Sequence, residues 1–126
     1  MVQVDISQLS GECNAWREKL RQYRDEFTRD EGQLQQATRQ SLSKDQLRDV
    51  EHLHNQFHIQ RINIHDLKQT IKVHDRKMNF EKVAFNGYVN EDSLSRHEAL
   101  LDEVQSLEQT LLDLREEFNA FLSRTK

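Results

Sequence analysis

The fold is decided by residues 42–87, which read LSKDQLRDVEHLHNQFHIQRINIHDLKQTIKVHDRKMNFEKVAFNG. Apolar residues recur along this stretch at alternating steps of three and four positions, and Gln60 and His74 are polar members of the same row. The apolar members are Val50, Leu53, Phe57, Ile64, Leu67, Ile71 and Met78. Such spacing keeps one stripe of a helix facing partner helices along a shallow supercoil. The stretch therefore predicts a long helix with one buried seam.

Both ends of this helix have recognisable signals. Ser43 and Gln46 have the spacing of a capping box, in which each side chain bonds the backbone amide of the other residue. At the far end, Gly87 can take the left-handed conformation that commonly follows a helix. We therefore expect this helix to span about residues 44–85.

The segment before it predicts a helix over about residues 6–40, with Asp5 as its N-cap. Nine of the ten members of its three-and-four row are apolar, and Asp30 is the exception. The row consists of Ile6, Leu9, Cys13, Trp16, Leu20, Tyr23, Phe27, Asp30, Leu34 and Ala37. The residue types and spacing are those of a coiled-coil-like seam.

The last segment predicts a helix over about residues 91–124, with Asn90 as its N-cap. Its seam is Leu100, Val104, Leu107, Leu111, Leu114, Phe118 and Phe121. Short connections force sequential helices to fold back on each other. The prediction is an all-α fold: residues 1–126 form one domain, an antiparallel up-down-up three-helix bundle or an elongated coiled-coil-like rod. The alternative is a helical hairpin that completes a bundle only in an oligomer.

The predicted shape resembles that of spectrin-like three-helix bundles, which also have a tryptophan in the first helix, here Trp16. The resemblance concerns architecture alone, and no site residue is carried over from it.

Composition narrows the class of protein further. The chain has 126 residues, no proline and three glycines, which argues against an all-β fold with many tight turns. Its net charge of −4 does not suggest a nucleic-acid binder. Its single cysteine fits a reducing compartment, and it has neither a secretory signal nor an apolar run of about 20 residues that could span a membrane. We expect a cytoplasmic protein that binds neither nucleic acid nor membranes.

No catalytic motif supports an enzyme. Cys13 lies on an apolar seam, so we expect it to act as a small buried hydrophobe and not as a nucleophile. Glu51, His54 and His58 share a helix face at a spacing that can chelate a metal. Cations on the same face, such as Arg61, oppose a metal ion. We therefore expect no metal, no cofactor and no catalysis, with a bundle binding metal through Glu51, His54 and His58 as the alternative.

Surplus apolar residues are the best functional clue. Two of the predicted helices place apolar side chains well away from their seams: Ile59, Ile62, Val73, Leu94, Leu101 and Leu112. Single exposed apolar residues are ordinary, but six on two helices suggest a further surface to be covered. We expect a non-enzymatic helical interaction or scaffolding protein that binds itself or another helical protein through these residues.

Overall fold

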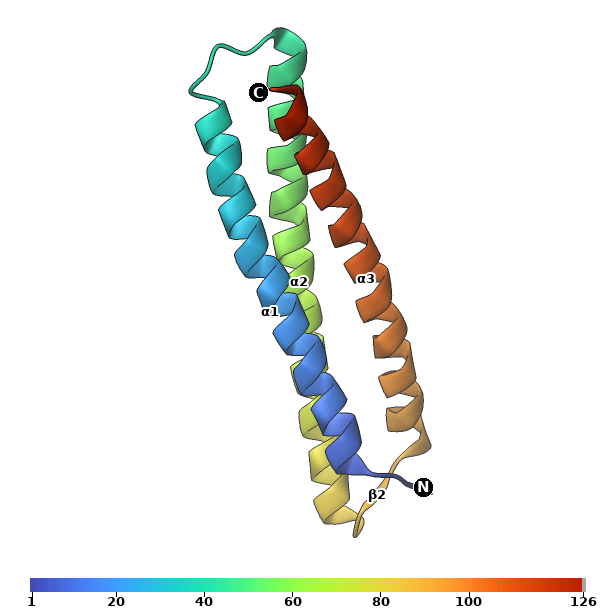
Figure 1. The fold of residues 1–126 in the computed structure, drawn as a ribbon. Coiled ribbons are helices and arrows are strands. Elements are labelled where there is room, and N and C mark those ends of the chain that lie inside the picture. The colour runs from blue at the N-terminus through green and yellow to red at the C-terminus, as the bar shows by residue number, and fades with distance from the viewer. Residues whose placement is uncertain (126) are drawn as a thin grey trace.

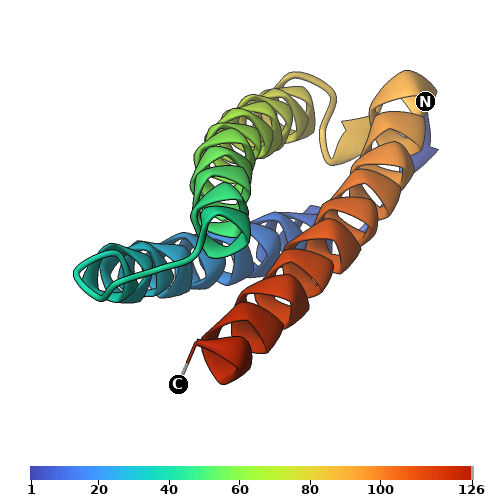
Figure 2. The ribbon, with the colours of Figure 1, turned by 90° about the horizontal axis from the view of Figure 1, so that it is seen from above.

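The computed structural model describes residues 1–125 and consists of three long helices. They are α1 (Ile6–Ala37), α2 (Lys44–Ala84) and α3 (Glu91–Arg124). Figure 1 shows α2 running opposite to α1 and α3, and the view down the bundle in Figure 2 shows that the three helices surround a shared interior. The predicted all-α, up-down-up three-helix bundle is confirmed.

The core consists of the predicted seams. Every apolar seam residue named above is buried or half-buried, and the rings of Phe27, Phe57 and Phe118 form a chain of edge-to-face contacts with centroids 5.1 and 5.4 Å apart. The polar seam members Asp30, Gln60 and His74 are buried as well. The three-and-four spacing therefore identifies the interior of the bundle even where a residue is polar.

The helix starts follow the predicted caps. The Asp5 side chain accepts the Gln8 amide, and both hydrogen bonds of the capping box between Ser43 and Gln46 are present. The Asn90 side chain accepts the Asp92 amide.

Two helix ends differ from prediction. α1 ends at Ala37 and not near Gln40, because the next three amides bond carbonyls three residues back, which tightens the chain into turns. After α2, Asn86 occupies the first left-handed position (φ 53°) and Gly87 follows at φ 93°. The Gly87 amide then reaches the Lys82 carbonyl at 2.8 Å, as in a Schellman motif shifted one residue from the prediction.

A small two-stranded ribbon was not predicted. β1 (Val2–Gln3) pairs antiparallel with β2 (Tyr88–Val89), and Val2 lies opposite Val89. Val89 is fully buried, so the ribbon fixes the N-terminal segment against the turn between α2 and α3. Strands of two residues carry no periodicity that sequence reading could detect.

Polar contacts set the register between the parallel helices α1 and α3. Tyr23 donates a hydrogen bond to Glu108, and Arg115 donates to both Asp30 and Glu26. The partners Tyr23 and Glu108 are 85 residues apart in the sequence, and so are Asp30 and Arg115. Burial raises the pKa of Asp30, although the Arg115 guanidinium acts in the opposite direction. This ion pair replaces an apolar layer in the last third of α1.

None of the helices in residues 1–125 is both long enough and apolar enough to cross a membrane.

We expect Arg115→Met to lower the free energy of unfolding by about 3 kcal/mol, because it leaves the buried Asp30 carboxylate without its cation. Asp30→Leu combined with Arg115→Met should restore most of the loss by rebuilding an apolar layer. Urea denaturation of both variants measures their free energies of unfolding. If the double variant loses as much stability as Arg115→Met alone, the loss does not come from an unpaired Asp30 carboxylate.

Candidate functional site

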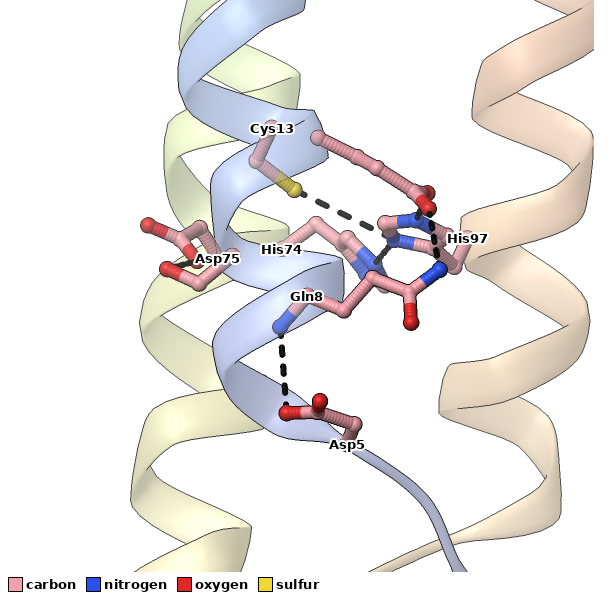
Figure 3. A network of polar contacts seen from close by, with 8 residues as sticks. Asp5, Gln8, Cys13, His74, Asp75 and His97 are labelled. Carbon is pink, nitrogen blue, oxygen red and sulfur yellow. Dashed lines mark hydrogen bonds and ion pairs between the residues drawn. The ribbon is translucent and has the colours of Figure 1, made fainter.

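Three side chains that can each bind a metal, one from each helix, meet inside the bundle. Figure 3 shows the side chains of Cys13, His74 and His97 pointing toward one another. His74 Nε2 lies 3.1 Å from His97 Nδ1, and Cys13 Sγ lies 3.9 Å from the same nitrogen. The three ligand atoms all lie within 4.8 Å of one another.

Glu12 orients His97 from the far side of its ring. The Glu12 carboxylate lies 2.8 Å from His97 Nε2. Because an ionised carboxylate only accepts hydrogen bonds, the geometry assigns the proton to Nε2 and leaves the lone pair of Nδ1 facing His74 and Cys13. The Trp16 ring packs against the His97 ring, with centroids 4.8 Å apart, and limits its rotation.

Burial governs the protonation of the other two groups. Cys13 is fully buried, and His74 and His97 are about 5% exposed or less. Burial, followed by the carboxylates of Asp75 and Glu12, raises the pKa of the Cys13 thiol to about 12. Burial lowers the pKa of His74 to about 4, and the neighbouring His97 and Arg96 act in the same direction. At neutral pH the cluster therefore holds a thiol and an uncharged His74 imidazole.

Further hydrogen bonds hold the three helices around this cluster. Ser10 of α1 donates to Asp75 of α2 at 2.7 Å, one residue along from His74. Glu81 of α2 is buried and accepts from the Ser93 hydroxyl at 2.8 Å and from the Asn90 amide at 3.2 Å. These bonds fix the first turn of α3, and thereby His97 in the next turn.

A groove between α2 and α3 reaches the cluster from outside. It has a volume of about 600 Å³, and His74 and Ser93 form part of its wall. Lys77 and Arg96 also line it and supply positive charge. The groove gives solvent-sized molecules access to the side of the cluster formed by His74.

The sequence-predicted metal candidates are not part of this cluster. Glu51, His54 and His58 are all exposed, and within residues 1–125 they belong to no group of three ligand atoms close enough to hold one ion. His58 instead lies in a shallow groove with Arg24 and Arg61, where the positive charges oppose a cation.

Five of the six predicted interface residues are exposed in the chain: Ile59, Ile62, Val73, Leu101 and Leu112. Leu94 is half-buried, so it contributes less free surface than expected. Sequence reasoning missed two residues on α2 that are more exposed than any of these, Phe80 at 69% and Val83 at 82%.

Sequence reasoning also missed the contact between Cys13 and His97. Cys13 is buried as expected, but its sulfur faces a histidine. The signal for His97 was present, because extending the three-and-four row of α3 backward from Leu100 reaches His97 and then Ser93. Which residues of the three helices lie side by side depends on the two connections between the helices. The spacing of residues within one helix does not specify this alignment.

The chain matches no protein-family model, no curated protein and no solved structure, so its own geometry carries the functional argument.

The stability of the metal-free protein should depend on His74 at mildly acidic pH. Its pKa is about 4 when folded and near its ordinary 6.5 when unfolded, so the unfolded chain binds more protons between these values. The free energy of unfolding should fall by up to about 3 kcal/mol as the pH drops from 6.5 to 4.

Urea denaturation across that range checks the effect, in the presence of a chelator. His74→Gln, which keeps an N–H donor, should flatten the dependence, whereas His58→Gln at an exposed position should not. A wild-type slope retained in His74→Gln would assign the effect to other groups.

Proposed function

We propose that this chain is a metal-binding three-helix bundle that holds Zn²⁺ through Cys13, His74 and His97. One observation carries the proposal: a thiol and two imidazoles converge from three different helices, with their ligand atoms within 4.8 Å of one another in a buried site. Thiolate and imidazole ligands together favour zinc over harder cations such as Mg²⁺ or Ca²⁺.

The distances between the three ligand atoms can be compared with those around a tetrahedral ion. Zinc–ligand bonds of about 2.0–2.3 Å place neighbouring nitrogens about 3.4 Å apart, and sulfur and nitrogen about 3.6 Å apart. The nitrogens of His74 and His97 are 3.1 Å apart, and Cys13 Sγ is 3.9 Å from the His97 nitrogen. The third pair, Cys13 Sγ and the His74 nitrogen, lies within 4.8 Å. Cys13 and His74 would therefore approach each other by up to about 1 Å to complete the geometry.

The surroundings support the same proposal. A metal-bound histidine usually donates its other ring N–H to a carboxylate, which fixes its tautomer, and Glu12 occupies that position beside His97. Three protein ligands leave one position of a tetrahedral ion to a solvent molecule, and the groove beside His74 provides access.

This proposal departs from the sequence-based expectation of no metal, because the cluster joins residues far apart in the chain. It concerns binding alone. We expect no catalysis, since the sequence contains no nucleotide-binding, nucleophile-elbow or zinc-protease motif.

Titration of chelator-stripped protein with Zn²⁺ tests the proposal. We expect one ion per chain and a rise in melting temperature, because the ion binds the folded state. Cys13→Ser and His97→Gln should each weaken zinc binding by more than about 100-fold, since loss of a ligand costs more than loss of a supporting group. Co²⁺ should give a thiolate charge-transfer absorption that Cys13→Ser abolishes.

Two further variants separate this site from the alternatives. Glu12→Gln keeps all three ligands and should weaken zinc binding by about 10- to 100-fold. His54→Ala with His58→Ala should leave binding unchanged. If stoichiometric zinc binding disappears only in the His54→Ala/His58→Ala variant, the ion binds at the exposed face of α2. If the wild-type chain binds no zinc, the cluster is a hydrogen-bonded structural layer.

A second candidate function is that of a helical interaction protein, binding itself or another helical protein. The supporting observation is that α2 leaves Ile59, Ile62 and Val73 exposed on the side away from the bundle interior. We expect such a protein to act in the cytoplasm without binding nucleic acid.

Ile59→Glu combined with Ile62→Lys should preserve helicity and melting temperature, because both side chains are about half exposed (45% and 47%). It should weaken association, because burying one branched aliphatic side chain contributes roughly 1.5–3 kcal/mol. Circular dichroism and native mass measurement on protein purified from its natural host check both parts. Unchanged association would exclude these two residues from an interface.

A further inference from the structure

The outward face of α2 carries a second row with the same three-and-four spacing as the buried seam. Its members are Ile59, Ile62, Asp66, Gln69, Val73, Arg76, Phe80 and Val83. All eight are exposed, and five are apolar. The row extends along about 36 Å of helix, at a rise of about 1.5 Å per residue. A helix with apolar rows on two sides has a second surface on which another helix can pack.

We infer that two copies of this chain pair antiparallel along this row, about a two-fold axis level with residue 71. The inference rests on the proposed interaction function and names its partner. In this arrangement the apolar ends of the row meet: Ile59 of one copy faces Val83 of the other, and Ile62 faces Phe80. Because steps of three and four alternate along the row, its residues occupy two kinds of position in turn. In each facing pair, a residue of one kind meets a residue of the other kind, as in an antiparallel coiled coil.

The polar residues in the middle of the row match under the same operation. Asp66 of one copy faces Arg76 of the other, and Gln69 faces Val73. Neither Asp66 nor Arg76 forms an ion pair within the described residues 1–125, so both charges are free to pair between copies. A parallel arrangement would instead place like charges opposite each other. Charge therefore favours the antiparallel arrangement.

Charge reversal tests the register. Asp66→Arg sets arginine against arginine in both symmetric pairs, and Arg76→Asp sets aspartate against aspartate. Each variant alone should raise the dimer dissociation constant about tenfold or more, measured by sedimentation equilibrium. An equimolar mixture of the two should regain wild-type affinity as a heterodimer, because each charge then meets its opposite. The double variant Asp66→Arg/Arg76→Asp should also dimerise as wild type does.

Glu51→Arg is the matched control, because it makes the same charge change at an exposed position of α2 outside the row. It should leave the dissociation constant unchanged. A wild-type chain that stays monomeric at millimolar concentration overturns self-pairing, and so does a mixture that associates no better than its components. In either case, the Ile59→Glu/Ile62→Lys variant still tests the broader interaction function. If that variant loses association while the mixture of charge-reversal variants does not regain it, the surface binds a different partner or pairs in a different register.

Discussion

The register between the parallel helices α1 and α3 determines which side chains meet inside the bundle. Glu12 and His97 lie 85 residues apart, as do Asp30 and Arg115. If α3 slipped by one heptad, its apolar seam would still face an apolar seam. Asp30 would then meet Leu122 or Glu108 in place of Arg115, and its buried carboxylate would lose its cation. The apolar layers therefore supply most of the packing, while the polar contacts select one register among several of similar hydrophobic quality.

The polar layers differ in how completely their groups are matched. In the layer of Asp30, one guanidinium bonds two carboxylates, so each of these charged groups has an oppositely charged partner within the chain. In the layer of Cys13, a fully buried thiol has only a long 3.9 Å contact with His97. An apolar residue there would continue the seam and avoid the cost of burying polar groups. Departures from local packing rules of this kind concentrate at functional sites, which is why the cluster and not the ion pair supports a function.

The sequence was sufficient for the helices and insufficient for the site. Caps and periodicity located the three helices to within a few residues, because these signals are local. Asn86 took the left-handed position expected of Gly87, since both residue types tolerate positive φ. The cluster depends instead on how far each connection shifts the next helix along its axis relative to the preceding helix. His97 lies on the extended seam of α3, but only the folded register places it beside Cys13.

The two faces of α2 connect the proposed zinc site to the proposed pairing surface. His74 belongs to the inward row and Val73, the preceding residue, to the outward row, and both line the groove that leads to the cluster. Gln69, which would face Val73 of a second copy, lines it too. A helix docked on the outward row would therefore cover part of this groove. The fourth position of a bound ion would then be less accessible to solvent in the dimer than in the monomer, so metal exchange and association would be linked through adjacent residues of one helix.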